Sequence, residues 1–139
     1  MEIKMSQFNL GTIILKFDLP ATLIDDINEA YDKHNGQMPS YNTQLAGKIA
    51  DEKKVNTILT EEMKQTFQTC FEKYMAIRNE VKWNCVPGPC WINEMKAGEY
   101  NPTHYHTSIG SEMGLSSVLM LKRPDWYGVE ASREEKPAN

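Results

Sequence analysis

The spacing of apolar residues predicts one strand and then two helices in the first half of the chain. Residues 12–17 are β-branched and aromatic, and Pro20 follows, so a strand and then a break are expected. A helix is expected between Pro20 and Gly36, where apolar residues recur at helical spacing with acidic residues on the other side. Gly36 is expected to end this helix in the left-handed conformation.

A second helix is expected from about Leu59 to Val81. Its apolar side chains recur at i, i+4, i+7, i+8, i+11 and i+14, a stripe that is typical of a face packed on a core. The stripe consists of Met63, Phe67, Cys70, Phe71, Tyr74 and Ile77. Residues 36–54, between the helices, are polar with glycine and proline, and they predict a loop with a short helical turn at Leu45 to Ala50.

The pattern changes to β after residue 85. The segment 86–89 contains two prolines and a glycine, so it cannot be helical. The alternation in residues 91–96 predicts a strand, the apolar run Leu115 to Lys122 predicts a second, and Trp126 begins a third. The predicted order is one strand, two helices and then strands, which indicates an α+β protein.

Length and charge limit the classes of function. The 139 residues fit a single domain, 1–139. Within it, residues 1–85 form an N-terminal strand and helical support region, and residues 86–139 form the first part of a β core. The formal net charge of −4 argues against a basic nucleic-acid platform. No apolar run is long enough for a membrane span, and the N-terminus lacks the pattern of a secretory signal, so a cytoplasmic protein is expected.

Three cysteines in a chain without a signal sequence indicate reduced thiols rather than disulfides. Cys85 and Cys90 form a C-x4-C pair around a turn. A zinc knuckle would normally need a second such pair, so two small buried residues that flank a turn are the favoured interpretation.

Two of the three histidines, His104 and His106, are separated by one residue. In a strand, side chains at i and i+2 point to the same face, so two imidazoles can take adjacent positions on one metal ion. Iron, zinc, copper and nickel all suit imidazole. The alternative is a pair of half-exposed strand histidines. The third, His34, is expected in the last turn of the first helix, where a partly positive ring complements the helix dipole.

Residues 91–106 followed by 115–124 resemble the iron(II)/2-oxoglutarate oxygenases of the prolyl-hydroxylase-like type, in a branch found in phages and marine bacteria. In that branch a Trp-x-Asn strand and a glycine precede the histidine motif. A leucine-serine-small-valine segment, an apolar strand and a proline follow it. The stretch 45–47, Leu-Ala-Gly, looks like the same branch, and the resemblance covers about residues 40 to 135.

The resemblance implies a double-stranded β-helix (jelly roll) with the two N-terminal helices packed on one outer face. It also implies an iron site with 2-oxoglutarate and O2 as co-substrates. His104 matches the first metal ligand, and His106 falls where the wider family has aspartate. Asn93 and Tyr100 lie where relatives place polar groups near the co-substrate. Lys122 is a further candidate, as a partner for a carboxylate of 2-oxoglutarate. The favoured alternative is a surface lysine with its ammonium group in water.

The resemblance also implies that the chain stops early. Relatives place a distal metal-binding histidine, and an arginine for the far carboxylate of 2-oxoglutarate, well downstream of the motif. No histidine follows His106, and Arg123 and Arg133 come too early in the strand order. The chain is therefore expected to contain about the N-terminal two-thirds of such an enzyme, truncated at the C-terminus. Open strand edges would then favour a homodimer.

Three functions remain open from the sequence. The resemblance implies a dioxygenase that uses Fe(II), 2-oxoglutarate and O2 to hydroxylate a protein side chain or a small molecule. Whether this chain is a working enzyme or an incomplete, inactive fragment is left open by the sequence. The alternative is a non-enzymatic jelly-roll binding or virion protein with a degenerate or zinc-binding site. A metal hydrolase that adds Glu94 or Glu112 to the histidines ranks last, because no H-E-x-x-H spacing is present.

Overall fold

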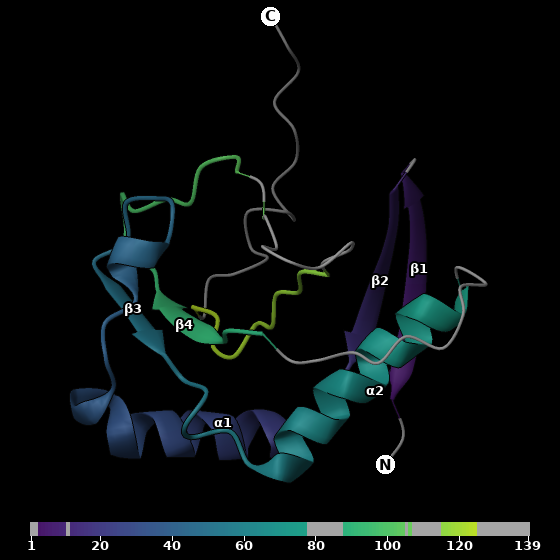
Figure 1. Cartoon of the computed structure of the whole chain (residues 1–139), viewed down its shortest axis with the longest axis horizontal. Coiled ribbons are helices and arrows are strands. Elements are labelled where there is room, and N and C mark those ends of the chain that lie inside the picture. The colour runs from purple at the N-terminus through teal and green to yellow at the C-terminus, as the bar shows by residue number, and fades with distance from the viewer. Residues whose placement is uncertain (1–2, 11, 78–87, 105, 107–114, 125–139) are drawn as a thin grey trace, which may run out of the picture.

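The computed structural model describes residues 3–10, 12–77, 88–104, 106 and 115–124. Within these ranges the chain is an α+β protein with two helices and two small antiparallel sheets (Figure 1). The helices are α1 (Ala21–His34) and α2 (Glu61–Ile77). The strands are β1 (Lys4–Leu10), β2 (Thr12–Asp18), β3 (Asp51–Lys54) and β4 (Trp91–Glu94).

The first sheet is the hairpin of β1 and β2, paired from Lys4 with Asp18 to Leu10 with Thr12. Strand β2 confirms the strand predicted over residues 12–17, whereas β1 was not predicted because its sequence is mostly polar. The hairpin and the β3–β4 sheet lie on opposite sides of the molecule in Figure 1, with α2 beside the hairpin. The hydroxyl of Tyr74 on α2 donates to the carbonyl oxygen of Ile13 at 3.2 Å, and this bond ties α2 to β2.

The second sheet joins two segments that are about 40 residues apart. Asp51 pairs with Glu94 and Lys54 pairs with Trp91, in antiparallel register. Single bridges of Ser40 with Lys53 and of Lys48 with Tyr100 extend this pairing. The strand expected at residue 91 is confirmed over Trp91–Glu94. Strand β3 falls in the predicted loop, because four charged residues carry no apolar alternation.

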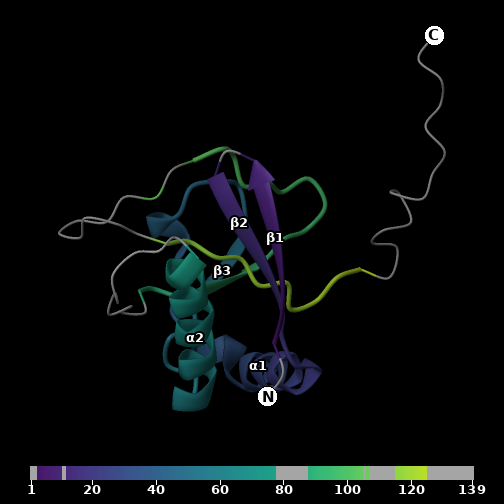
Figure 2. The same ribbon diagram turned by 90° about the vertical axis from the view of Figure 1, so that its right-hand side faces the viewer.

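The core lies between α1, α2 and the β3–β4 sheet. Figures 1 and 2 both place α1 at the base of the molecule, with the strands above it. One cluster joins the two helices, and a second lies under the sheet around Tyr31, Met38 and Val55, with Ile92 of β4 packed against it. The buried residues of the first cluster are Leu23, Ile27, Leu59 and Met63.

Both helices were predicted, with shifted ends. Helix α2 begins at Glu61, because the hydroxyl of Thr60 accepts the backbone N–H of Met63 at 3.2 Å and so caps the helix. The expected left-handed end at Gly36 is wrong. Gly36 lies in a 3-10 turn, Asn35–Gln37, which continues α1. Within the described residues, positive φ occurs at Gly47 and Gly98 instead.

The turn predicted at Leu45 to Ala50 is also wrong, since the 3-10 turn lies earlier, at Asn42–Gln44. The side chain of Asn42 explains this position. Its amide donates to the carbonyl oxygens of Ile49 at 3.1 Å and Ala50 at 2.8 Å, and so draws the rest of the loop back over the turn.

The strand predicted over Leu115 to Lys122 is wrong, because residues 115–124 form no strand. The apolar run that suggested it alternates in burial, since Leu119 and Leu121 pack against the core while Val118 is 88% exposed and Met120 55%. No strand among the described residues pairs with this segment, and a ladder needs such a partner. The segment is hydrogen-bonded to α1 instead, where the Asn28 side-chain amide donates to the Leu121 carbonyl oxygen at 3.3 Å. The strand expected at Trp126 lies outside the described residues.

Neither described helix combines the length and the apolar character that crossing a membrane requires.

Candidate metal-binding site

The β3–β4 sheet has two faces with different neighbours. Directly paired residues of antiparallel strands point to the same face, and the faces alternate along each strand. The pairs Glu52–Asn93 and Lys54–Trp91 therefore share one face, which we call the histidine face for the contacts described next. Asp51, Lys53, Ile92 and Glu94 point the other way, toward α1.

His104 and His106 come together with their Nε2 atoms 3.2 Å apart. Their rings are tilted by 63°, with centroids 4.9 Å apart. The Nδ1 atom of His104 lies 2.8 Å from the carbonyl oxygen of Pro102. Because a carbonyl oxygen accepts only, Nδ1 of a neutral ring carries the proton there, and the lone pair lies on Nε2. The lone pair of His104 is therefore directed at His106.

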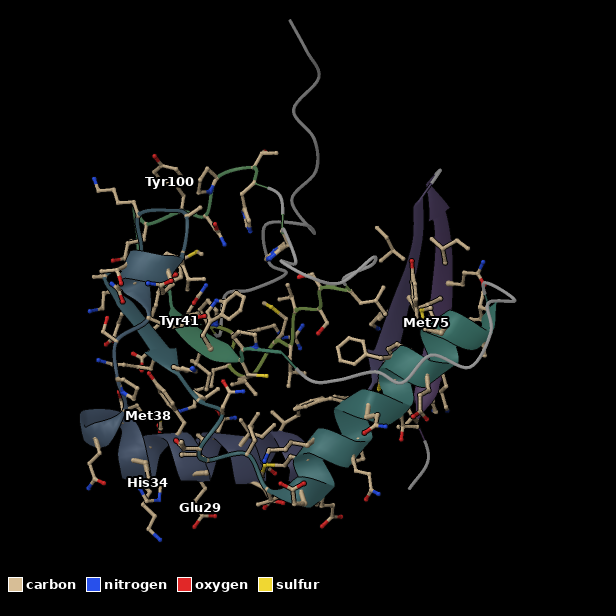
Figure 3. All side chains as sticks on the ribbon, in the orientation of Figure 1. Glu29, His34, Met38, Tyr41, Met75 and Tyr100 are labelled. Atoms are coloured by element: carbon tan, nitrogen blue, oxygen red, sulfur yellow. The ribbon has the colours of Figure 1, made fainter. Side chains whose placement is uncertain are left out.

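The ring of His106 packs on the histidine face of the sheet. Its ring is stacked on the indole of Trp91, with centroids 6.5 Å apart and an interplanar angle of 30°. Trp91 also contacts the ring of Tyr41, at 5.7 Å between centroids. Figure 3 shows Tyr41 beside β4. The two histidines were expected in a strand, but both described residues lie outside any strand. Contact with Trp91, rather than strand alternation, gives His106 its position.

The spacing of the two nitrogens fits a single metal ion. With metal–nitrogen bonds of about 2.0–2.1 Å, a separation of 3.2 Å corresponds to an angle of about 100° at the ion. Such an angle is suited to adjacent positions in tetrahedral or octahedral coordination. Among the residues that the structure describes, no group of three or more His, Cys, Asp or Glu side chains is placed to hold a metal. The described part of the chain thus offers two candidate ligands, both imidazoles.

Asn93 lies on the histidine face, two residues beyond Trp91. Its Oδ1 atom is buried and has no hydrogen-bond partner within the described structure. An amide oxygen in this position is free to accept from a bound molecule.

Tyr100 and Lys122 are placed differently. The side chain of Tyr100 is 56% exposed in the loop above the sheet (Figure 3), and its backbone pairs with Lys48. The ammonium group of Lys122 lies 3.2 and 3.1 Å from the two carboxylate oxygens of Asp32 on α1. The structure therefore does not bring Lys122 to the histidines. Glu94 faces α1, where its carboxylate accepts from the Asn35 amide at 3.4 Å, and Glu112 lies outside the described residues.

Three residues that contact the histidines, Trp91 or Tyr41 were not predicted. Tyr41 backs the indole of Trp91, the hydroxyl of Ser116 lies 3.4 Å from Nε2 of His106, and the ammonium of Lys54 lies 5.7 Å from the centroid of the Tyr41 ring. Ser116 stands in the Leu-Ser-Ser motif that contributed to the resemblance. No local sequence pattern marks Tyr41 or Lys54 as site residues, because the long-range pairing of β3 with β4 is what brings them close to Trp91.

Two carboxylates of the region around the β3–β4 sheet, Glu52 and Glu99, have pKa values displaced in opposite directions. Burial raises the pKa of Glu52, which is only 4% exposed, and the nearby charge of Glu99 raises it further. Glu99 accepts the backbone N–H groups of Lys96 at 2.8 Å and Ala50 at 2.9 Å, and these bonds lower its pKa. On the α1 side of the sheet, burial and the neighbouring Glu94 carboxylate raise the pKa of Tyr31.

A groove of about 390 Å³ opens elsewhere, between α1 and the start of α2. Its lining includes Asp26, Glu29, Lys33 and Glu62 but neither His104 nor His106, so it is separate from the candidate site. Comparison of the chain with protein-family models, with curated proteins and with solved structures found no match.

Proposed function

We propose that this chain is an Fe(II)/2-oxoglutarate-dependent dioxygenase of jelly-roll fold, which hydroxylates a protein side chain or a small molecule. The observation that carries the proposal is the 3.2 Å approach of the two Nε2 atoms, with the Nδ1 atom of His104 directed at a carbonyl oxygen. The resemblance of residues 91–124 to these oxygenases supports it. The layering also supports it, because α1 covers one face of the β3–β4 sheet and the histidines lie on the other.

In this proposal His104 and His106 hold the iron. Imidazole is a suitable iron ligand, and a ligand whose second ring nitrogen donates to a carbonyl is oriented and made more basic. Bound iron, 2-oxoglutarate and O2 supply the oxidising power. The contribution of the chain is to hold the two Nε2 atoms 3.2 Å apart, close enough for one ion to bind both. Imidazole in place of the usual carboxylate at residue 106 leaves the site with one negative charge fewer.

The histidine face carries two polar groups that the co-substrate could meet. One is the side chain of Asn93, whose buried Oδ1 only accepts, so that its NH2 group is the donor that could reach a carboxylate of 2-oxoglutarate. Lys54, paired with Trp91, contributes a cation on the same face. Because Lys122 is engaged with Asp32, Lys54 is the better candidate to meet a carboxylate of 2-oxoglutarate.

The test is an anaerobic iron(II) titration, with and without 2-oxoglutarate, followed by visible absorption. Succinate is then measured after air is admitted. We expect His104→Ala and His106→Ala to abolish binding, and 2-oxoglutarate to strengthen it in the unaltered chain. His34→Ala is the matched control, because it removes the one other histidine, on α1, and should leave binding unchanged. Iron binding that survives both histidine substitutions would refute the proposal.

A second candidate is a non-enzymatic binding or virion protein that holds zinc. The donor set favours it as an alternative, because two neutral imidazoles suit zinc as well as iron. In that case Zn²⁺ should bind through His104 and His106 in the same titration, while 2-oxoglutarate neither strengthens metal binding nor yields succinate.

A further inference from the structure

The two imidazoles are oriented by different means. His104 is held through Nδ1, the nitrogen that points away from its partner, by the carbonyl oxygen of Pro102. The hydrogen bonds of His106 within the described structure all run through Nε2, to His104 and to Ser116. In the proposed site Nε2 is the atom that would bind the metal, so these bonds cannot also hold the ring once a metal is present. The contact that remains for His106 is the stack on Trp91.

Trp91 is itself part of the β3–β4 sheet. It is the first residue of β4 and pairs with Lys54 of β3. The Tyr41 ring lies 5.7 Å from it, and the backbone N–H of Tyr41 donates to the carbonyl oxygen of Glu52 at 2.8 Å. The indole of Trp91 and the phenol ring of Tyr41 thus pack together on the sheet, whereas His106 itself lies outside any helix or strand.

We propose that Trp91 is a positioning residue for metal binding, which holds the His106 ring in the plane that turns Nε2 toward His104. This inference rests on the proposed function, since it concerns the same two histidines. It adds Trp91, which is not itself a metal ligand, as a residue that determines how strongly the two histidines bind the metal. Hydrogen-bonding groups that orient a metal ligand typically change metal affinity by about 10- to 100-fold, and we expect an effect of that order from the stacked indole.

The experiment compares Co²⁺ dissociation constants, measured by visible absorption, for the unaltered chain, Trp91→Leu and Trp91→Phe. Trp91→Leu should weaken Co²⁺ binding by about 10- to 100-fold, and Trp91→Phe, which keeps an aromatic face for the imidazole, should recover most of the loss. The matched control is Phe67→Leu, an aromatic truncation on α2 that packs in the helix core. It should leave the dissociation constant unchanged even where it lowers the melting temperature.

A second readout needs no metal. In the metal-free chain the ring current of Trp91 should displace the NMR signals of the His106 ring protons, and Trp91→Leu should remove that displacement. If Trp91→Leu does not fold, Tyr41→Leu takes its place, because it removes the ring behind the indole. Its expected effect is a smaller rise in the Co²⁺ dissociation constant.

The outcomes separate this inference from the proposed function. An unchanged Co²⁺ affinity in Trp91→Leu, or in Tyr41→Leu if that variant is used, overturns the role of Trp91 alone, provided that His104→Ala and His106→Ala still abolish binding. Absence of His104-dependent metal binding in the unaltered chain overturns the proposed function and this role together.

Discussion

At the scale of single residues, the unusual feature is a buried carboxylate, Glu52, on the histidine face of the β3–β4 sheet. Glu52 is 4% exposed, and one of its oxygens has no hydrogen-bond partner within the described structure. Burying a charge without a partner is unfavourable, so Glu52 is easier to bury when protonated. Asn93, directly opposite in the sheet, carries another buried oxygen without a partner. This stretch of the histidine face is organised around polar atoms rather than around packing alone.

The raised pKa of Glu52 predicts how stability changes with pH. A group with a raised folded pKa contributes stability that is fully present below its unfolded pKa, about 4.5, and is lost as the pH rises through the folded value. Glu52→Gln should therefore remove this loss and stabilise the chain at pH 8, on the order of 1 kcal/mol, with less gain at pH 4. Urea unfolding at both pH values measures the difference.

Glu99→Gln should change the pH dependence of stability in the opposite direction to Glu52→Gln. Its pKa is lowered by two backbone N–H groups, so its contribution is present above an unfolded pKa of about 4.5 and is lost as the pH falls through the folded value. The substitution should destabilise the chain at pH 7 and have little effect at low pH. A Glu52→Gln chain whose stability changes with pH just as the unaltered chain does would contradict the interpretation of Glu52.

At the scale of elements, local capping and long-range contacts contribute separately to the stability of the fold. The start of α2 depends on one side chain, because the Thr60 hydroxyl accepts the N–H of Met63. The segment 115–124 depends on the core, because Leu119 and Leu121 pack there without a strand partner in the described structure. Substitutions can test the two contributions independently.

Thr60→Ala should lower the free energy of unfolding by about 1 kcal/mol, since it removes the cap of α2. The matched control is Thr69→Ala within the same helix, where the hydroxyl bonds back to the carbonyl oxygen of Gln65 at 2.9 Å. That bond adds little to a helix that already satisfies the carbonyl, so the control should be close to neutral. Equal losses for both substitutions, measured by chemical unfolding, would argue against the cap.

Leu121→Ala should cost about 1–2 kcal/mol, less than for a fully buried leucine, because its side chain packs against the helix core while remaining partly exposed. Met120→Ala is the neighbouring control. Met120 is 55% exposed, so the change should stay within about 0.5 kcal/mol. If Leu121→Ala proves as mild as Met120→Ala in urea unfolding, the segment does not belong to the core.

At the scale of the whole molecule, apolar residues and strand edges remain exposed. Among the described residues, no strand pairs with the outer edges of β1, β2 or β4, whereas the outer edge of β3 is bonded to residues 39–41. Met5 is 44% exposed, Ile14 50%, Met120 55% and Val118 88%. Exposed edges and apolar side chains favour association with other chains. The homodimer expected from the sequence remains a prediction.

We expect the chain to associate as its concentration rises. Val118→Lys should weaken this association, because it places a charge among the exposed apolar side chains. Sedimentation velocity across a range of concentrations measures it. Gln44→Lys adds the same charge at an exposed polar residue and should leave association unchanged. A chain that stays monomeric at high concentration would count against the prediction.

The sequence by itself determined the parts of this protein that depend on local pattern. Helical spacing located α1 and α2, β-branched residues located β2, and alternation located β4. The pairing of His104 with His106 in the sequence also pointed to the candidate site. These features were readable because each one depends on residues within a few positions of one another.

Only the tertiary structure decided the rest. Strand β3 is a run of four charged residues that becomes a strand because β4, about 40 residues away, pairs with it. Residues 115–124 have the alternation of a strand but form none, since no described strand lies beside them. The place of His106 follows from Trp91 and Tyr41, which the same long-range pairing brings together. A local pattern shows which face a side chain prefers, whereas backbone pairing between distant segments decides what that face meets.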